Sequence, residues 1–227
     1  MHCRIDNDRL VVDGRAAPFV ASPHVGGRIA PAAIILHDTA SPLAIDGPVA
    51  WFKDPRSKVS AHLVVGRDGE IVQMVECDRA AWHAGQSCWQ GRPNSNAWAI
   101  GIEIVNPGKL TRKGDRAIPW FGGPGWPLDD LVEMTTAEHG HGWWLPYTRE
   151  QIAAVDAIVR ALVIAYPTVT EVLGHYHVSP RRKVDPGPQF PLADMRAILG
   201  GRAAPSPDDV RARSEEHTSE LQSPCNL

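Results

Sequence analysis

The chain has 227 residues, of which 43% are hydrophobic and 22% charged, with a formal net charge of -3. This length suits one hydrophobic core better than two independent domains, and a charge so close to neutral argues against a nucleic-acid partner. No apolar run is long enough to span a bilayer, and charges at Arg4, Asp6, Asp8 and Arg9 stand where a signal peptide needs apolar residues. We therefore expect a protein that is cytoplasmic as synthesised and has no membrane partner.

Neither the cysteines nor the C-terminal residues are expected to stabilise the fold. The four cysteines stand at irregular spacings without a CxxC pair, which predicts ordinary thiols rather than a disulfide framework or a cysteine zinc cluster. The sequence RSEEHTSELQS, from Arg213 to Ser223, resembles the translation of a sequencing adapter. We expect a disordered tail over 202–227, with 213–227 a sequence artefact outside the fold.

The first half of the chain predicts an arm followed by short strands. Residues 1–30 are rich in Pro, Gly and small side chains, which indicates an extended arm. The apolar run 32–36 predicts a buried strand that ends at a polar His-Asp-Thr sequence, and 48–53 predicts a short helix. Residues 60–66 and 71–75 flank an Asp-Gly turn and predict a hairpin.

The second half predicts one more buried strand, a long loop and two helices. Residues 99–105 read as a strand, whereas 106–147, heavy in Gly, Pro and Trp, predict an irregular functional loop. Thr148 and Gln151 have capping-box spacing before an apolar helical face that runs to 166. Val172 and Leu173 indicate a short strand and 191–199 a last helix. The order predicts a single α/β domain with a central mixed sheet flanked by helices.

Metal-ligand and acid-base side chains cluster at the ends of the predicted strands. They are His37, Glu103, His175, Lys183 and Asp185. A zinc hydrolase needs three protein ligands and an open position, and the two histidines with Asp185 supply such a set. Glu103 then suits a general base and Lys183 suits stabilisation of an oxyanion.

These residues lie in blocks that resemble one family. The blocks are LHDTAS, VSAHLVVGRDGEIVQMV, AAWHAGQS, NAWAIGIEIVN and GHYHVSPRRKVDPGPQF, spread over roughly 31–199. Together they resemble the zinc-dependent type 2 N-acetylmuramoyl-L-alanine amidases, a group that includes phage lysozyme-like amidases, muropeptide-recycling amidases and peptidoglycan recognition proteins. The resemblance implies an amidase catalytic domain over 31–201. It also implies a Zn²⁺ cofactor and cleavage of the amide bond between N-acetylmuramic acid and L-alanine in peptidoglycan or muropeptides.

Carried over by position, the resemblance implies roles for single residues. Zinc falls on His37, His175 and Asp185, and the catalytic pair on Glu103 and Lys183. Two positions depart from patterns in the group. Ala61 replaces the tyrosine of the phage lysozyme type, which indicates the glutamate-using branch. His177 stands where an acidic residue is usual, so either His175 or His177 is left as the second histidine ligand.

Other polar and aromatic residues are candidate substrate contacts. We expect His62, His83, Trp82 and Asn106 to bind substrate, with structural hydrogen bonding as the alternative for the two histidines. Tryptophans gather between 82 and 144, and we expect at least one to form a wall of the substrate groove. His139 and His141 lie in a Gly-rich segment, where we expect no second metal.

The sequence leaves other functions open. A non-catalytic peptidoglycan-binding module of the same fold is the main one, and the presence of Asp185 favours the hydrolase instead. A glycosidase would need a second carboxylate paired with Glu103, and the sequence offers none in a comparable setting. Recycling of muropeptides and cell-wall lysis as a phage endolysin both stay open, and we expect a monomer.

Overall fold

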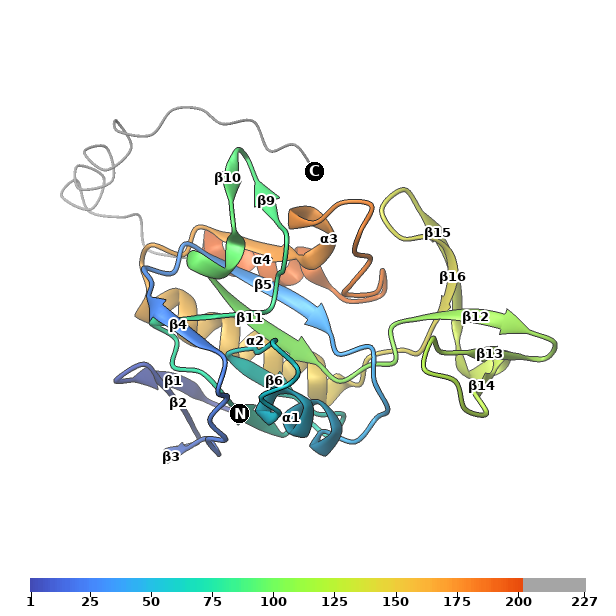
Figure 1. The fold of residues 1–227 in the computed structure, drawn as a ribbon, viewed down its shortest axis with the longest axis horizontal. Helices are drawn as coiled ribbons and strands as arrows, with labels where there is room; N and C mark the ends of the chain where they lie inside the picture. The colour runs from blue at the N-terminus through green and yellow to red at the C-terminus, as the bar shows by residue number, and fades with distance from the viewer. Residues whose placement is uncertain (202–227) are drawn as a thin grey trace.

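Five strands form a central mixed sheet in the computed structural model, which describes residues 1–201 (Figure 1). In spatial order they are β17 (Glu171–Gly174), β5 (Ala33–Asp38), β11 (Ala99–Ile104), β6 (Leu63–Val65) and β7 (Ile71–Gln73). The first four are parallel, and β7 returns antiparallel to β6 through the expected Asp-Gly turn. This confirms the predicted α/β class and the mixed sheet.

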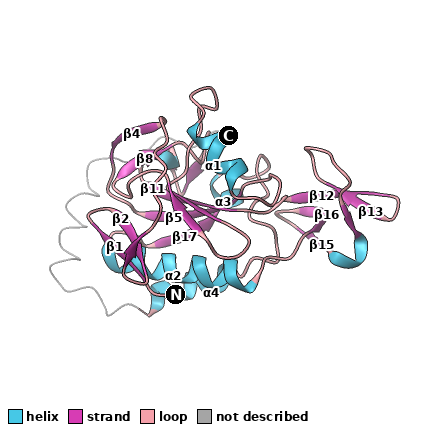
Figure 2. Cartoon of the chain, turned by 90° about the horizontal axis from the view of Figure 1, so that it is seen from below, coloured by secondary structure: helices cyan, strands magenta, loops and turns pink. Residues whose placement is uncertain are grey.

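Helices cover both faces of the central sheet. α2 (Arg149–Ala165) and α4 (Leu192–Gly200) lie on one face, while α1 (Asp46–Lys53) and the single turn α3 (His175–Val178) lie on the other (Figure 2). α2 begins with the expected capping box, in which the Thr148 side chain accepts a hydrogen bond from the Gln151 backbone N–H at 3.0 Å.

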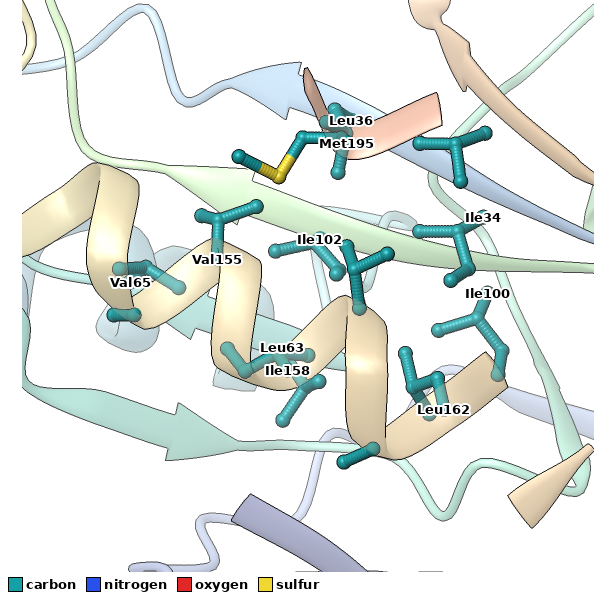
Figure 3. Close-up of a cluster of buried hydrophobic side chains, with 14 of the residues drawn as sticks. Ile34, Leu36, Leu63, Val65, Ile100, Ile102, Val155, Ile158, Leu162 and Met195 are labelled. Carbon is teal, nitrogen blue, oxygen red and sulfur yellow. The ribbon is translucent and has the colours of Figure 1, made fainter. Parts of the chain in front are cut away.

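Alternation along β5 and β11 decides which side chains meet each helix layer. Ile34 and Leu36 of β5 pack with Ile100 and Ile102 of β11 against α2 (Figure 3). Successive side chains of a strand point to opposite faces, so the positions between these isoleucines and leucines face away from α2. The second face carries a smaller apolar cluster near the start of both strands: Ala33, Ile35 and Ala99. Further along, the same face presents polar side chains.

The segment 106–147 forms a second antiparallel sheet, so the prediction of an irregular loop was wrong. Its strands are β14 (Trp126–Pro127), β13 (Arg116–Ile118), β12 (Lys109–Lys113), β16 (Gly140–Trp144) and β15 (Val132–Thr136), in spatial order. We call residues 109–144 the inserted sheet; it projects from one end of the central sheet (Figures 1 and 2). Its strands hold two to five residues and bury few side chains, so they carry no clear apolar alternation.

Residues 1–30 also contain strands, which differs from the expected extended arm. β1 (Cys3–Asp6), β2 (Arg9–Val12) and β3 (Arg15–Ala16) form a small sheet, and β4 (Val25–Arg28) pairs with β8 (Arg79–Ala81). Leu10 is buried in the same core as α2, and the Tyr166 hydroxyl donates to Asp8 Oδ1 at 2.6 Å. Burial of Leu10 thus ties the segment to the domain. The proposed boundaries at 30 and 201 stay predictions, and the tail 202–227 lies outside the described residues.

The remaining short elements connect these layers. They are β9 (Cys88–Trp89), β10 (Arg92–Pro93) and two short 3-10 helices, Ser95–Ala97 and Leu128–Asp130. Cys3 and Cys77 are buried free thiols. Within residues 1–201, none of the helices combines the length and the apolar character that crossing a membrane requires.

Candidate metal centre

Three side chains converge where β5 and β17 end. His37 is the last residue but one of β5, His175 begins α3 directly after β17, and Asp185 follows in the loop before α4. The His37 and His175 Nδ1 atoms are 2.9 Å apart, and Asp185 Oδ2 lies 3.0 Å from His175 Nδ1 and 3.4 Å from His37 Nδ1. Both histidines are almost fully buried. The parallel register of β5 and β17 brings together residues that are far apart in sequence.

The hydrogen bonds of His175 fix its tautomer. Its Nε2 lies 3.1 Å from the carbonyl oxygen of Ala84. A carbonyl only accepts, so Nε2 carries the proton and Nδ1 presents its lone pair to Asp185 and His37.

The tautomer of His37 is fixed by its contact with His83. His83 Nε2 lies 3.2 Å from the Ala99 carbonyl oxygen, so it donates there and leaves His83 Nδ1 as an acceptor. His37 Nε2 lies 2.9 Å from that Nδ1 and must therefore carry its proton. The Nδ1 atom of His37 is left as a lone pair that faces Asp185.

The donor set fits a cation. Two imidazole lone pairs and one carboxylate oxygen approach one another with no proton assigned between them, and a metal ion would satisfy all three. Within residues 1–201, His37, His175 and Asp185 are the one group of three or more metal-ligating side chains close enough to hold an ion. His177 is not part of it, because its Nδ1 accepts from the Gly174 backbone N–H at 3.1 Å and its Nε2 from Arg196 at 2.9 Å.

The pKa shifts of His37 and Asp185 favour the forms of these side chains that bind a metal. Burial, with a smaller contribution from His175, lowers the pKa of His37 to about 4, so the ring is neutral at pH 7. Burial alone would raise the pKa of Asp185, but its contacts with His175 and His37 outweigh burial and hold that pKa well below its usual range. A neutral imidazole beside a carboxylate is the state that binds zinc.

Glu103 stands beside this cluster with a carboxyl group that nothing in the described chain satisfies. It is 8% exposed, and its Oε2 has no hydrogen-bond partner among residues 1–201. Burial raises the pKa of Glu103 well above its usual range, and the charges of Asp185 and Asp38 add to this, while Lys183 opposes it. An unpartnered buried carboxyl is costly and therefore points to a chemical role.

A cavity of about 370 Å³ opens beside the cluster. Its walls include three cationic side chains, Lys58, Arg182 and Lys183, and two of the predicted substrate contacts, Trp82 and His83. His175 also lines it, so the cavity reaches one of the three side chains of the cluster. Trp82 is 40% exposed and lines this cavity, while the expectation that a tryptophan walls the substrate groove stays a prediction. The contact of Trp82 with substrate stays a prediction as well.

Two other predicted substrate contacts have partners inside the protein. His62 lies 2.8 Å from the Arg79 carbonyl oxygen through Nε2 and accepts the Gly101 backbone N–H through Nδ1 at 2.9 Å. Asn106 donates to the Leu145 carbonyl at 3.0 Å and accepts from the Gly108 N–H at 3.0 Å. Hydrogen bonds within the protein thus occupy every side-chain polar atom of both residues, as the structural alternative for His62 expects, and a substrate role for them stays a prediction.

Residues near the cluster that the motifs did not single out help to hold it. Asp38 accepts from the Tyr147 hydroxyl at 2.6 Å and from the Gly187 backbone N–H at 3.0 Å, which ties β5 to the loop of Asp185. His139 lies 3.0 Å from the Pro186 carbonyl oxygen through Nε2 and so contacts the same loop. Asp38 was visible in LHDTAS, directly after His37, but adjacency does not reveal a partner 109 residues away.

Comparison with known proteins agrees with this geometry. The profile of the N-acetylmuramoyl-L-alanine amidase family matches residues 27–188. The 1,6-anhydro-N-acetylmuramyl-L-alanine amidase AmpD of Citrobacter freundii is 34% identical over 143 residues, which are 63% of this chain and 58% of that protein. The chain thus spans less than two thirds of this relative.

Solved structures share the fold. The crystal structure of a selenomethionine AmpD derivative has a TM-score of 0.60 at 31% identity, over 86% of this chain and 98% of that one. The Escherichia coli amidase AmiD, solved with the substrate anhydro-N-acetylmuramic acid-L-Ala-D-γ-Glu-L-Lys, has a TM-score of 0.55 at 25% identity, over 92% and 70%. With a family profile that covers well over half of its length and a sheet that places the expected ligands together, this chain belongs to the N-acetylmuramoyl-L-alanine amidase family.

Proposed function

We propose that the protein is a zinc-dependent amidase that hydrolyses the bond between N-acetylmuramic acid and the L-alanine of a stem peptide. One observation carries the proposal: two histidine lone pairs and a carboxylate converge beside an unpartnered buried glutamate. Such a donor set is typical of catalytic zinc sites, which have three protein ligands and an open position.

The relatives support anhydromuropeptides as the proposed substrate class. AmpD is named for the 1,6-anhydro form of the muramyl group, and the AmiD structure holds an anhydromuramyl tripeptide. We therefore favour cleavage of anhydromuropeptides, as in recycling, over lysis of the intact wall by an endolysin. The cationic walls of the cavity suit the carboxylates that a stem peptide carries.

The proposed roles follow from position. His37, His175 and Asp185 would hold the zinc, which when bound supplies Lewis acidity toward the amide carbonyl and toward water. In this proposal Glu103 accepts a proton from the attacking water as the new C–O bond forms. It then returns that proton to the alanine nitrogen as the C–N bond breaks.

In the same proposal Lys183 stabilises the transition state. It lines the cavity with His175, and its charge acts on Glu103 and His37. An ammonium group there would stabilise negative charge that develops on the carbonyl oxygen. The non-catalytic binding module is less favoured, because such a module needs neither the third ligand nor a buried unpaired carboxyl.

The experiment is digestion of an anhydromuramyl tripeptide by the full chain, with zinc and after treatment with a chelator, followed by mass spectrometry. We expect zinc-dependent release of a free peptide that starts with L-alanine. Intact peptidoglycan is the second substrate, and faster cleavage of it would favour the endolysin role. Binding without cleavage by protein that holds zinc would establish the binding module instead.

A further inference from the structure

His83 lies behind the proposed metal site, and its surroundings are built around its ring. It is 9% exposed and packs over β11, where a Cβ on Gly101 would overlap the His83 ring. A glycine inside a fully buried strand weakens the strand unless another group needs the space. The His83 backbone is also held, because the N–H groups of His83 and Ala84 both donate to Asn96 Oδ1, at 3.1 and 2.8 Å.

The contacts of His83 leave one arrangement of protons. Its Nε2 donates to the Ala99 carbonyl, its Nδ1 therefore accepts, and His37 Nε2 is the donor that faces it at 2.9 Å. The two rings meet nearly edge to face, at 81°. The chain of donors thus runs in one direction from His37 through His83 to the backbone of β11.

Ala84, the next residue, accepts a hydrogen bond from His175, the second histidine of the cluster. The Ala84 carbonyl accepts from His175 Nε2 at 3.1 Å and from the Arg182 guanidinium at 2.6 Å. Residues 83 and 84 therefore contact both histidines of the cluster on the side away from Asp185.

We propose that His83 is a positioning residue for the metal ligand His37: it accepts the His37 Nε2 proton and thereby holds the Nδ1 lone pair toward the metal. The inference rests on the proposed zinc site and extends it beyond the three ligands. A second acceptor behind a ligating imidazole fixes both the tautomer and the ring orientation, and loss of such a partner costs about 10–100-fold in metal affinity or activity. His83 also lines the cavity, but this role needs no contact with substrate.

A matched pair of variants separates the acceptor from the shape of the side chain. His83→Asn places an amide oxygen near the position of Nδ1, whereas His83→Leu has a similar outline and no acceptor. We expect His83→Leu to weaken zinc binding by about 10–100-fold in a competition titration with a chelating dye, and His83→Asn to retain most of the affinity. The d–d absorption of the Co²⁺-substituted protein should change in His83→Leu and stay near wild type in His83→Asn.

Thermal unfolding of the metal-free proteins is the control for a merely structural role. Wild-type zinc affinity in His83→Leu would overturn the proposal, and so would equal losses in both variants that match equal losses of metal-free stability. Wild-type protein that takes up no zinc would instead refute the proposed function. Because a leucine at this site can fail to fold, the ¹⁵N imidazole shifts of the wild type provide a test without a variant. A His83 protonated at Nδ1 in the zinc-loaded protein would sink the proposal.

Discussion

Glu103 and His37 are direct register partners on the parallel strands β11 and β5. Side chains paired in this way leave the sheet on the same face, which here is the face opposite α2. One strand pair therefore places the proposed general base beside the first proposed metal ligand, on a rigid part of the molecule. The predictions below follow from this arrangement.

Replacing Glu103 by glutamine should abolish most turnover and leave the metal in place. We expect a loss of about 10²–10⁴-fold in kcat with the anhydromuramyl tripeptide, because the amide cannot take the proton from water. Zinc content should stay at the wild-type level. The free energy of unfolding should not decrease, since the variant removes a buried carboxyl without a partner. Near-normal turnover would exclude Glu103 as the base.

Removing a ligand should remove the metal. His37→Ala and Asp185→Ala are expected to lose bound zinc after dialysis, measured by elemental analysis, because two ligands remain of three. His141→Ala is the matched control, since this histidine is exposed and pairs with Glu133. His177→Ala should also keep its zinc, and loss of metal in that variant alone would reverse the assignment of His175.

His62 should make stability depend on pH. Burial lowers its pKa to about 4 from an ordinary value of 6.5. Between these values the unfolded chain binds a proton that the folded protein does not, so the free energy of unfolding falls as the pH falls from 6.5 to about 4. The slope is about 1.4 kcal/mol per pH unit for one group.

Denaturant unfolding of metal-free protein at several pH values measures this slope. His62→Gln should remove one group's share of it, while the other histidines contribute equally to both proteins. Identical slopes for variant and wild type would show that His62 titrates normally.

Asn106 distinguishes a structural role from a substrate contact. Asn106→Ala breaks two buried hydrogen bonds, which should lower the free energy of unfolding by about 1–3 kcal/mol and leave KM unchanged. Thr111→Ala, at an exposed position of the inserted sheet, is the control. A raised KM with unchanged stability would restore the predicted substrate contact.

Periodicity and turn chemistry explain which parts of the fold could be predicted from the sequence. β5, β11 and α2 bury long apolar faces, so their patterns are strong, and the Asp-Gly turn fixed the β6–β7 hairpin. The inserted sheet escaped prediction because its strands are short and bury few side chains. β12, for example, buries Leu110 alone among five residues. The N-terminal strands are equally short, with four residues or fewer.

The candidate site, too, could be predicted from the sequence only in part. The family blocks named His37, His175 and Asp185, which the fold brings together, because ligand types at strand ends are visible in sequence. They did not reveal that His83 faces His37 across 46 residues, because only the packed structure sets that distance. The same holds for Asp38 and Tyr147, whose contact joins the ends of two distant elements.

The chain enters and leaves the inserted sheet at adjacent points, where the Asn106 side chain donates a hydrogen bond to the Leu145 carbonyl. Because this contact holds the two ends of the segment together, the inserted sheet can change in length and surface without moving β11 or α2. It is nevertheless coupled to the loop of Asp185, through His139 to Pro186 and through the Gln189 amide to the Trp144 carbonyl at 3.2 Å. Swapping the inserted sheet between relatives would therefore exchange a surface and also loosen the loop of Asp185, the proposed metal ligand, unless both contacts were transplanted with it.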